Sequence, residues 1–224
     1  MSRKILHIGS AEKFMPSFIE LVKENFDFNC HEFYLSKGMA EKDIPQSDNI
    51  YLLPNNKRLS KLKHYSQILL KMHQADKVIL HSLADISIVK LLFLSPWLLK
   101  KCYWVIWGND LYTYKFDKRN RRWRVREVYR RPVIKKMGYL VTYMQGDINL
   151  AREWYGAQGE YKECLMYTSN IYKSVEIKKS ANSQVSIQLG NSANSTNNHI
   201  EIIEKLARFE DNNFRVYTPL SYSD

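Results

Sequence analysis

The chain has 224 residues, of which 45% are hydrophobic and 25% are charged, so it is long enough and apolar enough to bury a core. This composition excludes an intrinsically disordered protein. Its three cysteines, Cys30, Cys102 and Cys164, have an odd count and no metal-ligand spacing, which indicates reduced thiols in a cytoplasmic protein. The net charge of +11 points to an anionic partner.

No secretory or membrane-spanning segment is expected. Residues 1–4 lead directly into a short strand-like segment rather than a long apolar one. The most apolar stretch, residues 86–99, is interrupted by Lys90 and Pro96 and is shorter than the ~20 apolar residues that cross a bilayer. We therefore expect the chain to start in the cytoplasm and, at most, to touch a membrane surface.

Segments typical of strands alternate with segments of helical periodicity up to residue 167. This alternation predicts an α/β fold with a parallel sheet and right-handed crossovers. The expected strands are 4–9, 31–35, 49–53, 77–81, 102–107, 139–143 and 161–167, and the expected helices are 13–25, 59–73, 85–94, 119–137 and 147–155.

A second α/β unit is expected to begin at Val185. Residues 168–184 are polar and lack clear periodicity, which predicts a linker between two domains, 1–167 and 185–224. The second unit contains a strand, a helix at 197–209 and a further strand at 214–218. Because two strands and one helix cannot cover both faces of a parallel sheet, we expect this unit to be the start of a larger domain and the chain to be a fragment.

The segment from Val185 into this helix has the pattern of a phosphate site. Gly190 allows a sharp turn after the strand, and the polar residues that follow can cap a helix whose positive end attracts anions. The loop lacks the lysine of a Walker A motif and the spacing of G-x-G-x-x-G, so an ordinary capped loop is the alternative. The candidate residues are Gly190, Asn191, Ser192, Asn197 and His199.

Polar residues also follow the strands of the first unit, where open α/β sheets bind ligands. Asp110, after Gly108 and Asn109, is the best-placed carboxylate for a general base, with a capping or Asx-turn role as the alternative. His81 ends its strand and is the second candidate base, although a lone histidine is more often structural. Asp147 precedes an apolar helix, so capping is its expected role.

Basic charge is concentrated in residues 115–136, with apolar residues such as Trp123 and Val125 interleaved. The pattern predicts a basic amphipathic helix of the kind that binds anionic membrane surfaces, with a solvated helix face as the alternative. Each basic residue near an anionic bilayer contributes about 1 kcal/mol, so several can hold a protein there without a transmembrane anchor. The expected membrane patch comprises Arg119, Arg121, Arg122, Arg124, Arg126, Arg130 and Arg131.

Nucleic acid is the other anionic partner that an arginine-rich helix can bind. No helix-turn-helix, zinc-ligand set or aromatic RNA-binding signature accompanies the basic run, and polar loops at strand ends would have no role in a simple basic binder. We therefore expect no nucleic-acid partner.

Taken in order, a set of motifs between about Val78 and Tyr222 resembles the family of TDP-4-acetamido-4,6-dideoxygalactose transferases, glycosyltransferase family 56. The motifs are Ile106-Trp107-Gly108, Asp110-Leu111-Tyr112, Gly146-Asp147, and Gly190-Asn191-Ser192 with Asn197 and His199. The resemblance implies a glycosyltransferase-B architecture, in which two Rossmann-like domains face each other across a cleft. It also implies transfer of a deoxy-amino sugar from a nucleoside-diphosphate donor, with TDP as the expected nucleotide, to a polyprenyl-diphosphate-linked saccharide in surface polysaccharide synthesis.

The resemblance also assigns roles. His199, Ser192 and Asn197 would contact the donor diphosphate, and the first domain would face the acceptor and the inner face of the cell membrane. No cofactor is implied, and because the DxD-type carboxylate pair is absent, no metal is required. Because the second domain is expected to be incomplete, the 224-residue chain is expected to be inactive by itself. The alternative is a non-catalytic α/β module that binds anionic lipid or partner enzymes and derives from such an enzyme by truncation. The acceptor-side residues would be Trp107, Gly108, Asn109, Tyr112, Gly146 and Asp147.

Overall fold

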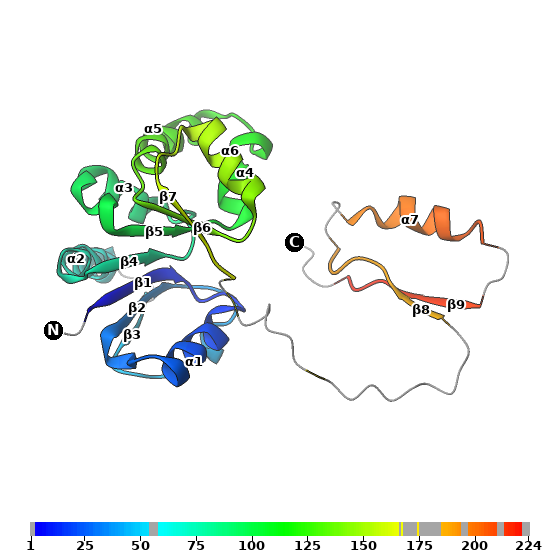
Figure 1. Cartoon of the computed structure of the whole chain (residues 1–224), viewed down its shortest axis with the longest axis horizontal. Helices are drawn as coiled ribbons and strands as arrows, with labels where there is room; N and C mark the ends of the chain where they lie inside the picture. Colours follow the sequence, from blue (N-terminus) through cyan, green and yellow to red (C-terminus); the bar gives the residue numbers. More distant parts are fainter. Residues whose placement is uncertain are drawn as a thin grey trace. The chain divides into compact units, whose positions relative to one another are not determined.

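The computed structural model describes residues 3–53, 58–165, 167, 174, 185–193, 197–209 and 213–220. The chain divides into two compact units, Met1–Tyr172 and Lys173–Asp224, which are described separately (Figure 1). Apart from Ser174, the expected linker at 168–184 lies outside the described residues.

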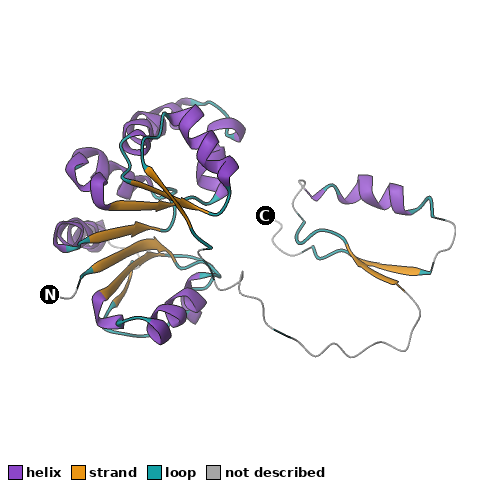
Figure 2. Ribbon diagram, viewed as in Figure 1, coloured by secondary structure: helices purple, strands orange, loops and turns teal. Residues whose placement is uncertain are grey.

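The first unit is built around a parallel sheet of seven strands in the order β3-β2-β1-β4-β5-β6-β7 (Figure 2). The α/β fold with a parallel sheet that the alternation predicts is confirmed. The chain builds the sheet outward from β1 to β3 and then returns to the other side of β1, which makes the β1–β4 boundary the topological switch point. The strands are β1 (Ile5–Ser10), β2 (His31–Ser36), β3 (Ile50–Leu52), β4 (Lys77–Leu80), β5 (Cys102–Val105), β6 (Tyr139–Thr142) and β7 (Glu160–Glu163).

Helices cover both faces of this sheet. Along β1, Leu6 and Ile8 pack into the larger core with helices α2 (Arg58–Gln74) and α3 (Ile86–Leu94). His7 between them faces Phe18 of helix α1 (Met15–Asn25). This alternation places a histidine inside the protein, on the face that α1 covers. The helices are α1 (Met15–Asn25), α2 (Arg58–Gln74), α3 (Ile86–Leu94), α4 (Gly108–Phe116), α5 (Arg121–Lys135) and α6 (Gln145–Tyr155).

Helix α4 is the element that the sequence did not predict. Its residues include glycine, asparagine, aspartate, threonine and tyrosine, which are weak helix formers, so the segment resembled a loop after the strand. The strand β5 ends at Val105, and Asp110 lies in the first turn of α4. Burial of Leu111 in the larger core, not local propensity, accounts for the helix.

The second unit contains β8 (Val185–Gln188), α7 (His199–Leu206) and β9 (Phe214–Tyr217). The two strands form their own parallel pair, with Val185 opposite Phe214. Within the described part of this unit, α7 carries exposed apolar side chains at Ile200 and Ile203. Over all described residues, no helix is both long and apolar enough to span a bilayer.

Two glycines give a matched test of the packing in the first unit. A Cβ at Gly138, before β6, would lie 2.6 Å from the Lys100 carbonyl oxygen, whereas a Cβ at Gly146 in α6 would meet nothing within 4 Å. Gly138→Ala should therefore lower the free energy of unfolding by about 1–3 kcal/mol, because backbone atoms must shift. Gly146→Ala should leave it unchanged or raise it by up to about 1 kcal/mol. Urea unfolding measures both, and equal losses would contradict this packing.

Candidate functional site

Two adjoining cavities open at the switch point, where β1 and β4 end. Their volumes are about 280 and 330 Å³, and they share the lining residues Ser10, His81, Ser82 and Ala84. This is the edge at which open α/β sheets bind ligands. The first cavity is also lined by residues that include Tyr34, Ser36, His64, Tyr65 and Asp85, and the second by Glu12, Met15, Trp107 and Asn109.

The backbone at Ser82, in the wall of both cavities, has a φ of +108°. Residues other than glycine rarely adopt this backbone conformation. Each such residue adds about 1–3 kcal/mol of strain, and the conformation persists only where the surrounding structure holds it. The neighbours do so here: the His81 amide donates to the Ile8 carbonyl (2.7 Å), and the Leu83 amide donates to Asp110 Oδ2 (2.8 Å). Backbone strain of this kind is concentrated at functional sites.

Asp110 fixes the loop that contains Ser82 and Leu83 by accepting a hydrogen bond from its backbone. Its side chain is buried, and Oδ2 also accepts a hydrogen bond from Trp104 Nε1 at 2.7 Å. Burial raises the pKa of Asp110, while the hydrogen bonds from Leu83 and Trp104 and the charge of Arg130 oppose that rise. Since Asp110 does not line either cavity, its geometry favours a positioning role over the role of general base that the sequence suggested.

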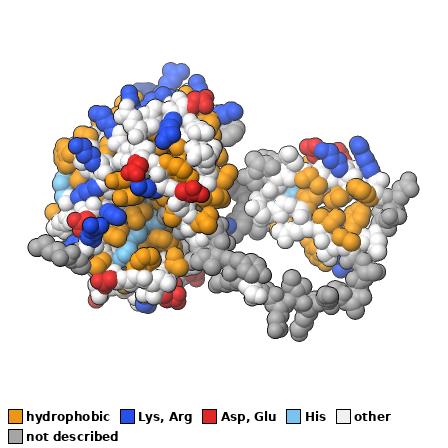
Figure 3. Space-filling view, viewed as in Figure 1, with side chains coloured by type: hydrophobic (Ala, Val, Ile, Leu, Met, Phe, Trp, Pro, Cys, Tyr) orange, Lys and Arg blue, Asp and Glu red, His pale blue; other side chains and the backbone are white. Residues whose placement is uncertain are grey.

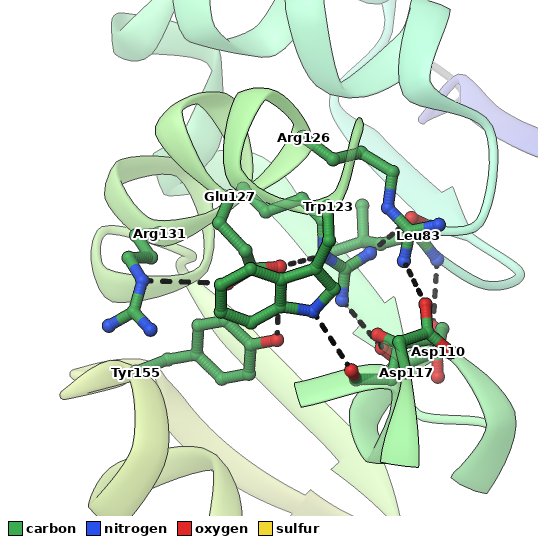
Figure 4. Close-up of polar contacts among 10 residues, drawn as sticks. Leu83, Asp110, Asp117, Trp123, Arg126, Glu127, Arg131 and Tyr155 are labelled. Atoms are coloured by element: carbon green, nitrogen blue, oxygen red, sulfur yellow. Dashed lines mark hydrogen bonds and ion pairs between the residues drawn. The ribbon is translucent and has the colours of Figure 1, made fainter. Parts of the chain in front are cut away.

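Arg130 supports the same loop, and Figure 4 shows Leu83, Asp110 and Glu127, which contact it. Its guanidinium donates to the carbonyls of Leu83 (2.7 Å) and Asp110 (2.5 Å) and pairs with Glu127 at 3.2 Å. The residue is only 1% exposed, so its assignment to the membrane patch was wrong: it faces the protein interior. Glu127 also pairs with Arg131 at 3.5 Å.

The residues expected on the acceptor side come from the carboxyl ends of β5 and β6. The Tyr112 hydroxyl donates to Asp147 Oδ1 at 2.7 Å and so ties α4 to α6. Asp147 was expected to cap α6. It lies instead in the first turn of the helix, where it accepts the hydrogen bond from Tyr112, and Met144 occupies the N-cap position. Gly108 permits this approach, because a Cβ there would lie 2.8 Å from the Tyr112 ring. Trp107 and Asn109 line the second cavity, and Gly146 is exposed at the start of α6.

His81, the second candidate base, is part of a buried row of side chains. Its Nε2 lies 3.0 Å from His7 Nδ1, and its Nδ1 lies 3.2 Å from the Tyr167 hydroxyl. His7 Nε2 in turn lies 2.9 Å from His31 Nδ1. Burial lowers the pKa of His81 to about 3, so this imidazole is neutral at physiological pH.

Sequence reasoning missed four residues of this site: His7, His31, Tyr167 and Glu12. The only local signals were a histidine at the centre of an apolar strand and a carboxylate just beyond it. In the described part of the chain, no group of three or more His, Cys, Asp or Glu residues is arranged to hold a metal ion.

In the second unit, the loop residues predicted to contact phosphate lie together. Gly190 has a φ of +69°, and a Cβ there would lie 2.5 Å from His199 Nε2. The Asn197 amide donates to the Ser192 carbonyl (2.9 Å) and to Asn191 Oδ1 (3.2 Å), which closes the loop. His199 opens α7, and its Nε2 is buried without a hydrogen-bond partner among the described residues. The loop thus presents polar groups at a helix N-terminus, where an anion is favoured.

The basic residues border an apolar groove between α3 and α5. Its volume is about 530 Å³, and its apolar lining residues are Ile86, Val125 and Tyr129. Figure 3 shows lysine and arginine side chains gathered over the part of the first unit where α5 lies. Arg126 also pairs with Asp117 at 3.2 Å. The exposed arginines of the expected patch are Arg119, Arg121, Arg122, Arg124 and Arg131, and Lys90, Arg121, Arg122 and Arg126 line the groove itself.

Comparison with known proteins gives one family. The model of the family described as 4-alpha-L-fucosyltransferase, glycosyl transferase group 56, matches residues 15–224. No curated protein matches the sequence significantly. Among solved structures, the chain is similar to a UDP-N-acetylglucosamine 2-epimerase from Rickettsia bellii, with 12% identity and a TM-score of 0.45, over 100% of this chain and 71% of that one.

Two adjacent arginines test the support of the Ser82 loop. Arg130→Leu leaves Glu127 buried without its nearest partner and two buried carbonyls without donors, so the free energy of unfolding should fall by about 3–5 kcal/mol. Arg131→Leu, whose side chain is 46% exposed, should cost at most about 1 kcal/mol. Chemical denaturation of both variants provides the comparison, and similar losses would mean that Arg130 does not hold the loop.

Proposed function

Because the chain belongs to glycosyl transferase group 56, the 4-alpha-L-fucosyltransferase family, we propose that it transfers a deoxy-amino sugar to a polyprenyl-diphosphate-linked saccharide. The family resemblance predicted from the motifs is confirmed, and the chain is a glycosyltransferase, which implies a nucleotide-sugar donor and an acceptor. The family match carries this conclusion. The specific donor, the acceptor and the roles of individual residues are our proposal.

We assign the donor to the second unit. A nucleoside-diphosphate sugar, with TDP as the nucleotide, would place its diphosphate at the start of α7. There the helix dipole, the Ser192 hydroxyl and the His199 ring can stabilise the charge that develops on the departing diphosphate. The contact between Gly190 and His199 supports this role, because it fixes the ring against the loop before any ligand binds.

The acceptor hydroxyl is assigned to the second cavity of the first unit. Its wall contains two titratable side chains, Glu12 and His81, and one indole, Trp107, on which a sugar ring can stack. His81 is our choice for the group that takes the proton, with Tyr167 between it and Trp107, and Glu12 can orient the hydroxyl. Asp110 then acts as a positioning residue, through Leu83 and the strained Ser82.

The two units would form the two halves of a glycosyltransferase-B enzyme, the first for the acceptor and the second for the donor. In this proposal, side chains and helix dipoles stabilise the leaving group, and no metal or cofactor is assigned. An acceptor saccharide linked to a membrane lipid requires the enzyme to work at a membrane surface, which we take to be the inner face of the cell membrane.

The groove between α3 and α5 suits that surface. Its apolar floor can receive a hydrocarbon chain, while Arg121, Arg122 and Lys90 can pair with lipid phosphates. A non-catalytic module that only docks on anionic lipid would share this groove. It would not need the strained loop or the cavities at the switch point, and for that reason we favour the enzyme.

A transfer assay with the full-length protein, a TDP-linked deoxy-amino sugar and a polyprenyl-diphosphate saccharide tests the chemistry. His81→Asn should lower kcat by about 10²–10⁴-fold with donor affinity unchanged, since general-base assistance is lost. His199→Ala should instead weaken donor binding, measured by calorimetry. His73→Gln, at an exposed histidine of α2, is the matched control and should behave as wild type.

Each alternative gives a different result in this assay. Full activity in His81→Asn with a loss in Glu12→Gln would move the base to Glu12. Unchanged donor binding in His199→Ala would exclude the phosphate site at α7. Vesicle binding without donor binding or transfer in the wild type would support the non-catalytic module.

The groove predicts charge-dependent binding to vesicles that contain phosphatidylglycerol. Replacing the exposed Arg121, Arg122 and Arg124 by Gln should weaken co-sedimentation by up to about 100-fold, and added salt should weaken the wild type. The control replaces three exposed lysines elsewhere, Lys23, Lys61 and Lys63, by Gln.

Equal weakening by the arginine and lysine sets would show that net charge, not the groove, holds the protein on the vesicle. Tighter binding to duplex DNA than to vesicles at physiological salt would instead favour a nucleic-acid partner.

A further inference from the structure

Four hydrogen-bonded side chains form a row through the first unit, from the start of β2 to the cavities at the switch point. In order they are His31, His7, His81 and Tyr167, joined at 2.9, 3.0 and 3.2 Å. We propose that this row is a proton relay, which carries the proton of the acceptor hydroxyl from the cavity to solvent beside His31. The proposal rests on the proposed function and adds His7 and His31 to it as positioning residues that act through His81.

The strands place the row. His7 lies at the centre of β1, His31 begins the neighbouring β2, and His81 follows β4 on the other side of β1. The three rings lie on the face of the sheet that α1 covers. Phe33 stacks on His7 at 4.4 Å, and Phe18 of α1 packs on His7 and His81 at 5.6 and 4.9 Å. These apolar rings cover His7 and part of His81, which limits the contact of the row with water along its length.

The hydrogen-bonding capacity of the row matches a relay. A neutral imidazole has one donor and one acceptor nitrogen, so all three rings can donate towards Tyr167 or all three can donate in the opposite direction, with His31 then donating to solvent. Trp107 Nε1, which can only donate, donates a hydrogen bond to the Tyr167 oxygen at 2.8 Å. The Tyr167 proton is therefore free to point at His81 in one state and away from it in the other.

Burial explains why His81 needs the row. Burial lowers the pKa of His81 to about 3. Burial and the charges of His81 and His31 also hold the pKa of His7 well below its usual value. An isolated His81 could not keep a proton taken from a sugar hydroxyl at neutral pH. It can accept one at Nδ1 only if it releases another from Nε2 in the same step.

The step balances as follows. The acceptor O–H bond breaks as the oxygen bonds to the sugar carbon, and the bond from that carbon to the diphosphate oxygen breaks. The proton goes to Nδ1 of His81, which lines the cavity, and the new N–H donates to the Tyr167 oxygen. The Nε2 proton of His81 moves to His7 Nδ1, and that of His7 Nε2 moves to His31 Nδ1. His31 then releases its Nε2 proton to solvent. All four side chains are neutral before and after. The row returns to its first state once the product has left, when His81 Nδ1 gives its proton to water in the open cavity and His31 takes one from solvent.

The far end of the row suits proton release. Burial lowers the pKa of His31, and the exposed carboxylate of Asp27 opposes part of that lowering. Asp27 itself accepts a hydrogen bond from Cys30 Sγ at 3.0 Å. At the other end of the row, burial and the charge of Asp110 raise the pKa of Tyr167, so the hydroxyl beside His81 stays neutral. Glu12 is the charged group that shares the cavity wall with His81.

The first measurement is independent of transferase activity. In protein labelled with ¹⁵N-histidine, the ring protons of His7 and His81 should exchange with deuterium far faster than global unfolding allows. Because concerted transfer needs both ends open, His31→Asn, which keeps a hydrogen-bond partner for His7 but cannot pass a proton on, should slow that exchange at least about tenfold. The control His73→Gln should not. Equal exchange in His31→Asn and wild type would overturn the relay.

The second measurement is turnover. His31→Asn and His7→Gln should each lower kcat about tenfold or more, within the range of acid–base assistance, while KM and the donor Kd from calorimetry change little. The solvent isotope effect on kcat should indicate several moving protons in the wild type and fewer in the variants. If His7→Gln does not fold, His31→Asn at the edge of the row still decides the question.

The two measurements separate the relay from the proposed function. A wild type that transfers sugar and keeps its kcat in His31→Asn overturns the relay and leaves the transferase in place. A wild type without transfer but with fast, His31-dependent exchange overturns the proposed function and leaves a conducting row.

Discussion

The carboxyl edge of the sheet depends on the hydrogen bonds and the ion pair that the buried guanidinium of Arg130 makes. It bonds the carbonyls of Leu83 and Asp110, and so joins α5 to the loop after β4 and to the first turn of α4. Glu127 supplies its counter-charge within the same helix. A charged pair removed from water does little for stability by itself, but it penalises any arrangement that leaves a partner unpaired. This penalty specifies one position for the loop that carries His81 and Ser82.

The sequence predicts most of the helices and the parallel sheet of the first unit, but it does not predict which side chains come together in its site. Alternating periodicity gave the strands and five of its helices, because each element buries a distinct face. It missed α4, whose residues have low helix propensity, and it placed Arg130 at the membrane because arginines occur all around α5. His7 and His31 were missed for another reason: 74 and 24 residues separate His7 from its two partners, and only the register of the sheet brings them together.

Because the chain belongs to a glycosyltransferase family, the imidazoles of the first unit and the polar loop of the second can be considered in terms of one reaction. A sugar transfer must remove a proton on one side of the reacting carbon and stabilise a diphosphate on the other. The first unit offers neutral imidazoles, whose proton affinity burial has reduced, and the second offers a helix N-terminus with a fixed histidine. The two kinds of group are not interchangeable, because a neutral ring in an apolar wall suits proton transfer, and a polar loop suits an anion.

The strained backbone of Ser82 has a consequence for affinity. A cost of about 1–3 kcal/mol corresponds to roughly a 5- to 150-fold change in an equilibrium constant. A ligand that allowed this residue to relax would gain up to that factor, whereas a ligand that requires the loop in its present form would gain none. The φ of +108° at one serine thus sets an upper bound on how far this loop can distinguish two ligands by changing shape. Any stronger preference has to come from contacts that the ligands make directly.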